Sequence, residues 1–103
     1  MSTSSKKNLA QYERLAGTLR DRIAAGIYAR GDKLPSEMEL MDESGLSRST
    51  VRHALKVLVD EGLVRTERTA GRFVTEDTAL IEQLRADTAQ TLAADFLEKM
   101  RGI

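Results

Sequence analysis

The chain has 103 residues, enough for one small domain and a short additional element. Cysteine is absent and histidine occurs once, which excludes disulfides, thiolate metal sites and cysteine nucleophiles and leaves too few ligands for a zinc centre. Sixteen basic residues balance sixteen acidic ones, and no apolar run reaches the ~20 residues that cross a bilayer, so we expect a soluble, cytoplasmic protein without membrane contact.

The first helix is predicted by an apolar stripe. Residues 1–7 are small, polar and basic, and we expect a mobile arm that either lies near an anionic partner or has no role. From Asn8 to Ala25, apolar residues recur every three or four positions, which predicts a helix that ends at Gly26. Residues 27–35 hold a glycine and the only proline, which is typical of a turn, with room for a very short strand at residues 33–34.

A second, short helix follows. Ser36 and Glu39 have the spacing of a capping box, in which each side chain bonds to the other residue's backbone N–H. This motif predicts a helix over residues 37–43. Gly45 then allows the left-handed conformation that reverses the chain within a few residues.

The third helix is predicted to begin after Ser47, to continue to Glu61 and to stop at Gly62. It differs from the second helix in charge, because residues 37–43 carry four acids and no base, whereas residues 44–56 carry three bases and no acid. Two helices joined by a tight turn are typical of a helix-turn-helix, whose second helix enters the major groove of DNA.

Arg48 and Arg52 lie on the face of this helix opposite its apolar residues. Each guanidinium suits two hydrogen bonds to guanine, or a contact to a phosphate. A solvated basic face is the alternative, but the preceding turn favours contact with DNA. Sequestration of both groups inside the molecule, against its own carboxylates, would overturn this interpretation.

The polar residues beside these arginines have two interpretations each. Ser47, Ser49 and Thr50 offer hydroxyl and N–H groups at a helix N-terminus, for a phosphate or for the helix cap. His53 either contacts DNA or is an inert exposed position, and we expect Met38 to pack rather than touch a thymine methyl group. The candidate DNA-binding residues of this unit are Ser36, Ser47, Arg48, Ser49, Thr50, Arg52, His53 and Lys56.

A hairpin is predicted after the third helix. Residues 63–67 and 72–75 are β-prone runs that flank a loop containing glycine. Arg68, Gly71 and Arg72 give this loop the shape and charge to reach an adjacent minor groove or phosphate. An ordinary exposed turn is the alternative.

Four segments occur in a characteristic order: LPSE at 34–37, LSRSTVR at 46–52, LVDEGLV at 58–64 and GRFV at 71–74. Together they closely resemble the winged-helix domain of GntR-type bacterial transcription regulators, over residues 12–75. The resemblance implies a mainly α fold with a small β wing, a winged helix-turn-helix. It also implies that Arg48 and Arg52 contact the operator and that Gly71 lies at the wing tip.

Three positions depart from the family pattern. Met38 stands where arginine is frequent, His53 where glutamate is frequent, and residues 69–70 where the wing is usually richer in glycine. An operator sequence is therefore not carried over from relatives. Only 28 residues follow Thr75, too few to enclose an effector pocket, and this short tail resembles the YtrA-like subgroup, whose C-terminal helices mainly dimerise.

The tail, residues 76–103, carries a net charge of −3, against +3 for residues 1–75. From about Thr78 to Arg101 it has no proline or glycine and one apolar stripe, which predicts a long amphipathic helix. We expect this helix to pair with its copy in a homodimer and to place two recognition helices about 34 Å, or a multiple, apart. A helix folded back on its own domain is the alternative. The candidate dimerisation residues are Ile81, Leu84, Leu92, Phe96 and Met100.

We therefore expect three units: an arm at 1–7, a winged helix-turn-helix at 8–75 and a dimerisation helix at 76–103. The predicted function is that of a homodimeric transcription repressor that binds a palindromic operator on double-stranded DNA, with no cofactor, no metal and no evident small-molecule effector. The alternative is a winged-helix module that recruits another protein. An enzyme is disfavoured, because the sequence shows no paired nucleophile and base and no phosphate-binding glycine loop.

Overall fold

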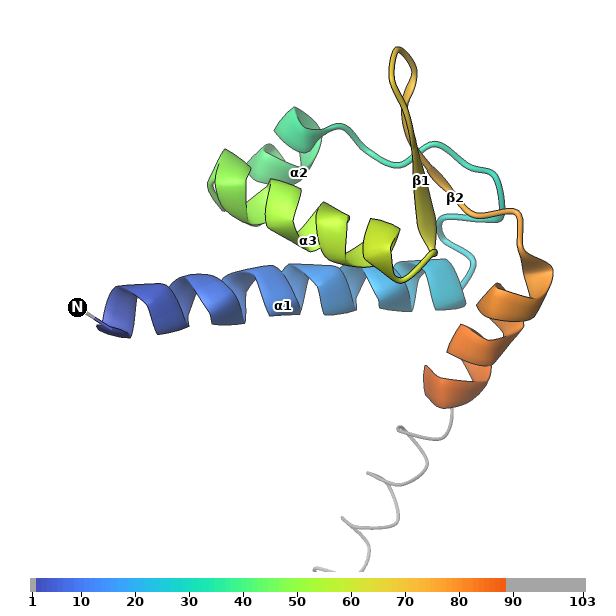
Figure 1. Ribbon diagram of the computed structural model, residues 1–103, viewed down its shortest axis with the longest axis horizontal. Helices are drawn as coiled ribbons and strands as arrows, with labels where there is room; N and C mark the ends of the chain where they lie inside the picture. Colours follow the sequence, from blue (N-terminus) through green and yellow to red (C-terminus); the bar gives the residue numbers. More distant parts are fainter. Residues whose placement is uncertain (1, 89–103) are drawn as a thin grey trace, which may run out of the picture.

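The computed structural model describes residues 2–88, with side chains from residue 11 onward. Its elements are, in chain order, α1 (Ser2–Ala24), α2 (Glu37–Ser44), α3 (Arg48–Asp60), β1 (Val64–Glu67) and β2 (Gly71–Val74). A further helix covers residues 78–88. The predicted class, mainly helical with a two-stranded wing, is confirmed. In Figure 1, α3 lies alongside α1, and the β1–β2 hairpin projects away from both.

α1 begins earlier than its apolar stripe predicts. It starts at Ser2 rather than Asn8, so residues 2–7, which we expected to be a mobile arm, are the first turns of the helix instead. No proline or glycine precedes Gly17, so nothing in the backbone stops the helix from extending toward the N-terminus. The predicted stop is confirmed, since Gly26 follows the helix with a left-handed φ of 82°.

The core lies between α1 and α3. The predicted stripe of α1 is buried at Leu19 and Ile23, and α3 buries Val51, Leu55 and Leu58 against it. The other parts of the chain complete the core with Leu34, Leu40, Leu63, Val64 and Val74. Burial of α3 along one side leaves its opposite side to solvent.

The capping box that begins α2 is confirmed. Ser36 Oγ accepts from the backbone N–H of Glu39 at 3.1 Å, and Glu39 Oε1 accepts from the backbone N–H of Ser36 at 3.2 Å. Gly45 ends the helix with φ 74° and donates its N–H to the carbonyl of Met41. Ser47 then caps α3 by accepting from the N–H of Thr50. The turn between α2 and α3 therefore forms as the sequence predicts.

The wing is an antiparallel hairpin in which Val64 pairs with Val74 and Glu67 with Gly71. The predicted short strand at residues 33–34 is present as a single bridge from Lys33 to Phe73. The N–H of Leu34 also donates to the carbonyl of Arg72 at 2.8 Å. The chain before α2 thus holds the outer edge of β2 and fixes the base of the wing.

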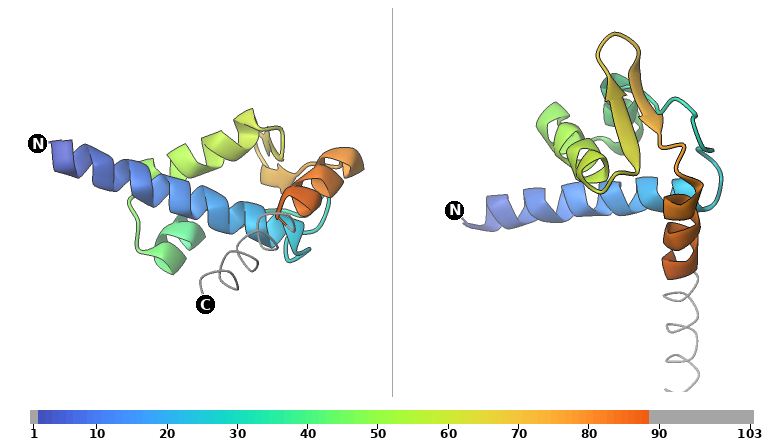
Figure 2. Two further views of the ribbon diagram at one scale, coloured as in Figure 1. Left: turned by 90° about the horizontal axis from the view of Figure 1, so that it is seen from below. Right: turned by 45° about the vertical axis from the view of Figure 1, so that its right-hand side comes forward.

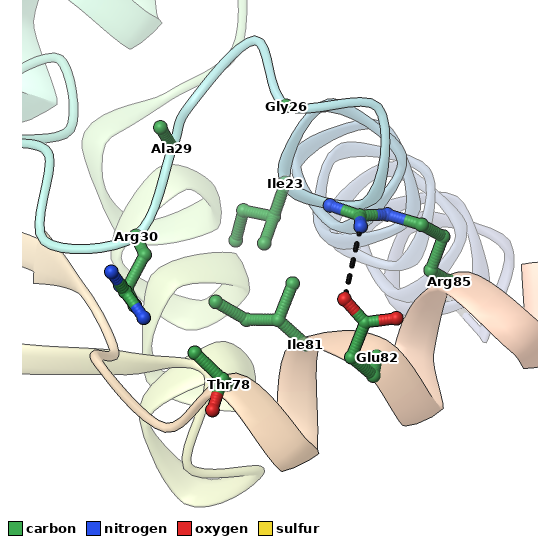
Figure 3. Close-up of a pocket in the computed structure, with 8 residues that line it drawn as sticks. All are labelled: Ile23, Gly26, Ala29, Arg30, Thr78, Ile81, Glu82 and Arg85. Carbon is green, nitrogen blue, oxygen red and sulfur yellow. Dashed lines mark hydrogen bonds and ion pairs between the residues drawn. The ribbon is translucent and has the colours of Figure 1, made fainter.

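The helix at residues 78–88 packs against the end of α1. Ile81 is buried and points toward Ile23 (Figure 3), and Leu84 is half-buried against the same core. Arg85 Nε donates to the carbonyl of Ala24 at 2.9 Å and so caps α1. Figure 2 shows this helix crossing the C-terminal end of α1 and leading away from it.

This packing corrects the assignment of two candidate dimerisation residues. Ile81 and Leu84 pack against the core of their own domain. The alternative, a C-terminal helix folded back on its own domain, therefore holds for the first turns of this helix. The other three candidates, Leu92, Phe96 and Met100, lie outside the described residues. Within residues 2–88, no helix is both long and apolar enough to cross a bilayer.

Two glycine substitutions test the role of the turn. Gly45→Ala should lower the free energy of unfolding by ~1–2 kcal/mol, because alanine is strained at a positive φ, although its Cβ would meet nothing within 4 Å. Gly17→Ala is the matched control: it lies within α1, also in open space, and should raise stability by ~0.5–1 kcal/mol. Urea unfolding followed by circular dichroism measures both. Equal stability of Gly45→Ala and the parent chain would contradict the assigned turn.

Candidate nucleic-acid interface

The solvent side of α3 carries the predicted contact residues. Arg48, Arg52 and Lys56 have side chains that are 50%, 59% and 72% exposed. Ser49 and His53 are exposed on the same helix. These side chains face solvent because the apolar residues between them are packed against α1. The sequence prediction of an exposed polar face is therefore confirmed.

Three arginines converge on one carboxylate, that of Glu37 in the first turn of α2. Arg52 Nε lies 3.0 Å from both carboxylate oxygens of Glu37. Arg72 Nη2, from β2 of the wing, donates to Oε2 at 3.1 Å. Arg48 Nε is farther away, at 3.9 Å from Oε1. We call Arg48, Arg52 and Arg72 the arginine cluster.

The carboxylate of Glu37 is charged in this setting. Its side chain is only 19% exposed, and this burial raises its pKa, but hydrogen bonds from Arg52 and Arg72 and their positive charge outweigh the burial. The net effect is a pKa below the ordinary value for glutamate. One negative charge thus stands among three positive ones, and the cluster keeps an excess of positive charge for an anionic partner.

The carboxylate contact does not sequester the arginines. Both hydrogen bonds from Arg52 use Nε, so they leave its two terminal nitrogens unused. Arg48 and Arg52 remain at least half exposed, whereas Arg72 is 26% exposed. The guanidinium groups on α3 are held from one side and open on the other, so they keep the forked geometry that binds guanine or phosphate.

The serines and threonine at the start of α3 form a cap. Ser47 Oγ lies 2.9 Å from Thr50 Oγ1 and 3.3 Å from Ser49 Oγ. Thr50 is only 7% exposed, so its hydroxyl serves the cap and it is removed from the candidate DNA-contacting side chains. Ser36 likewise caps α2. Ser49, which is exposed, keeps both interpretations.

The remaining candidates on α3, His53 and Lys56, each contact another side chain. His53 stacks on Tyr12 of α1, with ring centroids 3.7 Å apart and planes within 10°. Lys56 forms an exposed ion pair with Asp60, one turn later, at 3.0 Å. The stack holds the His53 ring against α1. The exposed Lys56–Asp60 ion pair contributes little to stability.

The wing adds positive charge at a distance from α3. Arg68 is exposed in the turn between the two strands. Gly71 has a φ of 110°, and a Cβ at this position would lie 3.2 Å from Lys33 Cε. On the outer face, the Arg65 guanidinium covers the ring of Phe73 at 5.0 Å from its centroid. Arg72 differs from these residues because it turns toward Glu37 rather than toward solvent.

Four residues of the surface were missed or misjudged from the sequence. The sequence predicted Glu37 only as an acid of residues 37–43 and as part of the LPSE segment, Lys33 only as part of a short strand, and Tyr12 only as one of the apolar positions of the first helix. Met38 is 60% exposed, so the expectation that it packs is wrong. The change of charge between residues 37–43 and 44–56 is the one signal that could have indicated a contact between α2 and α3.

The comparison with known families decides the classification. The profile described as "Bacterial regulatory proteins, gntR family" matches residues 11–74. The chain belongs to the gntR family. This membership confirms the resemblance to GntR-type regulators. Among the described residues, no group of three or more metal-binding side chains is close enough to hold an ion.

Curated relatives are longer than this gntR-family chain. The Exu regulon transcriptional regulator of Escherichia coli K12 is 43% identical over 63 residues, which are 61% of this chain and 24% of the relative. The histidine utilization repressor of Klebsiella aerogenes is 36% identical over 85 residues, 80% of this chain and 35% of the relative. The chain thus spans about a quarter to a third of the length of these relatives.

Solved structures share the fold. A GntR family transcriptional regulator from Listeria monocytogenes has a TM-score of 0.78 and 32% identity, over 88% of this chain and 80% of the other. The AraR DNA-binding domain in complex with operator ORX1 has a TM-score of 0.62 and 34% identity, over 63% of this chain and 78% of the other. The latter is a similar fold seen bound to DNA.

Arg52→Ala should reduce discrimination at one or two base pairs of a bound site, by ~1–3 kcal/mol if the contact is bidentate. Lys56→Ala is the matched control, since it removes one positive charge one turn later on the same face. It should weaken binding to all duplexes alike. Fluorescence anisotropy with a set of single-base-pair variants measures both. An equal loss on random DNA for Arg52→Ala would reassign that residue to a phosphate contact.

Proposed function

We propose that this gntR-family chain is a sequence-specific, DNA-binding transcription regulator, a homodimeric repressor that binds a palindromic operator. The arginine cluster carries this proposal, because two of its guanidinium groups stand half exposed on the second helix of a helix-turn-helix. In such a motif, the N-terminal part of that helix meets the base edges. The similar AraR DNA-binding domain was solved in complex with an operator, which supports DNA binding by this fold.

The contacts divide by chemistry into two groups. Arg48 and Arg52 have the forked donors that read guanine in the major groove. Ser49, Lys56 and Arg68 are exposed polar or basic groups suited to phosphates, which position the protein without reading the sequence. Arg72 belongs to neither group alone, since from the wing it donates to the Glu37 carboxylate that also holds Arg52. This division makes the recognition helix the main source of specificity.

Dimerisation is assigned to the C-terminal end of the chain. The first turns of the helix at residues 78–88 are docked on α1 by Ile81 and Arg85, so the direction in which this helix leaves the domain is fixed. Leu92, Phe96 and Met100 continue the same apolar stripe in the sequence. Pairing of this stripe between two copies would give a dimeric, YtrA-like regulator that acts on DNA in the cytoplasm.

Selection of bound duplexes from a random pool tests the proposal. We expect an inverted repeat whose half-sites are separated by about one DNA turn or a multiple. Affinity for the selected duplex should fall steeply as salt rises, because phosphate contacts release counterions. An unenriched pool would contradict DNA recognition and favour a module that recruits another protein.

Substitution of both Leu92 and Phe96 by charged residues tests the dimer interface separately from the DNA-binding surface. The double variant should be monomeric by light scattering and should bind a palindrome much more weakly, while its affinity for one isolated half-site stays close to that of the parent chain. An unchanged mass would contradict the assignment of the dimer interface to this stripe.

A further inference from the structure

Glu37 connects three elements of the surface. It lies in the first turn of α2, it accepts hydrogen bonds from Arg52 of α3 and Arg72 of the wing, and it stands 3.9 Å from Arg48. Its two strongest partners are 15 and 35 residues away in the sequence. The carboxylate therefore bridges the recognition helix and the wing, which otherwise extend in different directions (Figure 2).

The capping box of α2 does not account for the contacts of Glu37. The N-cap of this helix is Ser36, and the reciprocal bond of the capping box comes from Glu39. Glu37 takes no part in that motif. The bonds of its carboxylate go instead to side chains on other elements. A contact of this kind constrains the arginines more than it constrains the helix.

We propose that Glu37 is a positioning residue for sequence discrimination: it holds Arg52 and Arg72 in one arrangement, so that the recognition helix and the wing meet the DNA as a single unit. This inference rests on the proposed function. An arginine that is already ordered in the free protein loses less side-chain freedom when it binds. The Nε bonds to Glu37 also fix which edge of the Arg52 guanidinium remains for a base.

A competing effect has the opposite sign. A carboxylate beside the binding surface repels phosphates and occupies donors that DNA would use, so its removal favours binding to every duplex. Positioning, in contrast, favours only the duplex whose bases match the held arginines. The two effects are distinguished by the ratio of specific to random affinity, since a uniform electrostatic change leaves this ratio unchanged.

Glu37→Gln is the test variant, and Glu39→Gln is its matched control. Both remove one negative charge from the first turn of α2, and glutamine preserves the capping box at position 39. Affinity is measured for the selected duplex and for a random duplex of equal length, at several salt concentrations. We expect the ratio of the two affinities to fall about tenfold in Glu37→Gln, the loss of one good base contact. Glu39→Gln should keep the ratio of the parent chain.

A double-variant cycle shows whether Glu37 acts through Arg52. In an Arg52→Ala background, Glu37→Gln should change the ratio much less than it does alone, because the positioned side chain is already gone. Circular dichroism and thermal unfolding confirm that each variant is folded. A merely structural role would lower stability and leave the base-pair profile unchanged.

The failures of this inference and of the proposed function are distinguishable. A parent chain that prefers no duplex contradicts the proposed function itself. A parent chain that prefers the selected duplex, together with an unchanged ratio in Glu37→Gln, contradicts only the positioning role and makes Glu37 a competing anion. An equal fall of the ratio in Glu37→Gln and Glu39→Gln also contradicts positioning, because it assigns the effect to charge at the start of α2.

Discussion

The packing of α3 against α1 is the constraint on which the other features depend. Leu19 and Leu55 are completely buried at this contact, and removing apolar surface of this kind from water is the main favourable contribution to folding. Once the apolar side of α3 is fixed in this way, the helix has no freedom to turn its polar residues elsewhere. The exposed arginines are therefore a consequence of core packing rather than of any preference of their own.

Ion pairs then determine how the exposed arginines are held. The surface of α3 would carry free, mobile arginines if α2 were neutral, but the acidic start of α2 places a carboxylate beside them. The same carboxylate reaches the wing through Arg72. A single ion-pair network thus joins side chains of α2, α3 and the wing. A network of this type contributes more to stability than an isolated surface pair, which contributes about 0–1 kcal/mol.

The helices, caps and turns were readable from the sequence because they depend on residues close together along the chain. The capping box at Ser36 and the left-handed turn at Gly45 are local motifs, and both formed as predicted. The early start of α1 was missed because a polar segment without helix breakers has no clear boundary. Such local signals specify much of this fold, since caps and a tight turn delimit α2 and α3.

The side-chain contacts of the site were less predictable. An amphipathic stripe shows that one face is covered but not what covers it, which is why Ile81 and Leu84 were assigned to a partner rather than to their own core. For Thr50 the sequence left a phosphate contact and a cap both open, because the burial that decides for the cap depends on tertiary packing and not on the local pattern. The position of Glu37 among three arginines depends on the relative placement of three elements, which periodicity does not encode.

Nuclear magnetic resonance of the arginine side chains tests the central claim most directly. The Nε–H signals of Arg48, Arg52 and Arg72 are assigned in the free protein and followed as the selected duplex, and then a scrambled duplex, is added. The account predicts that these three signals shift together with the selected duplex and shift less with the scrambled one at moderate salt. Unchanged signals from all three arginines, with shifts confined to residues distant from α3 and the wing, would contradict it.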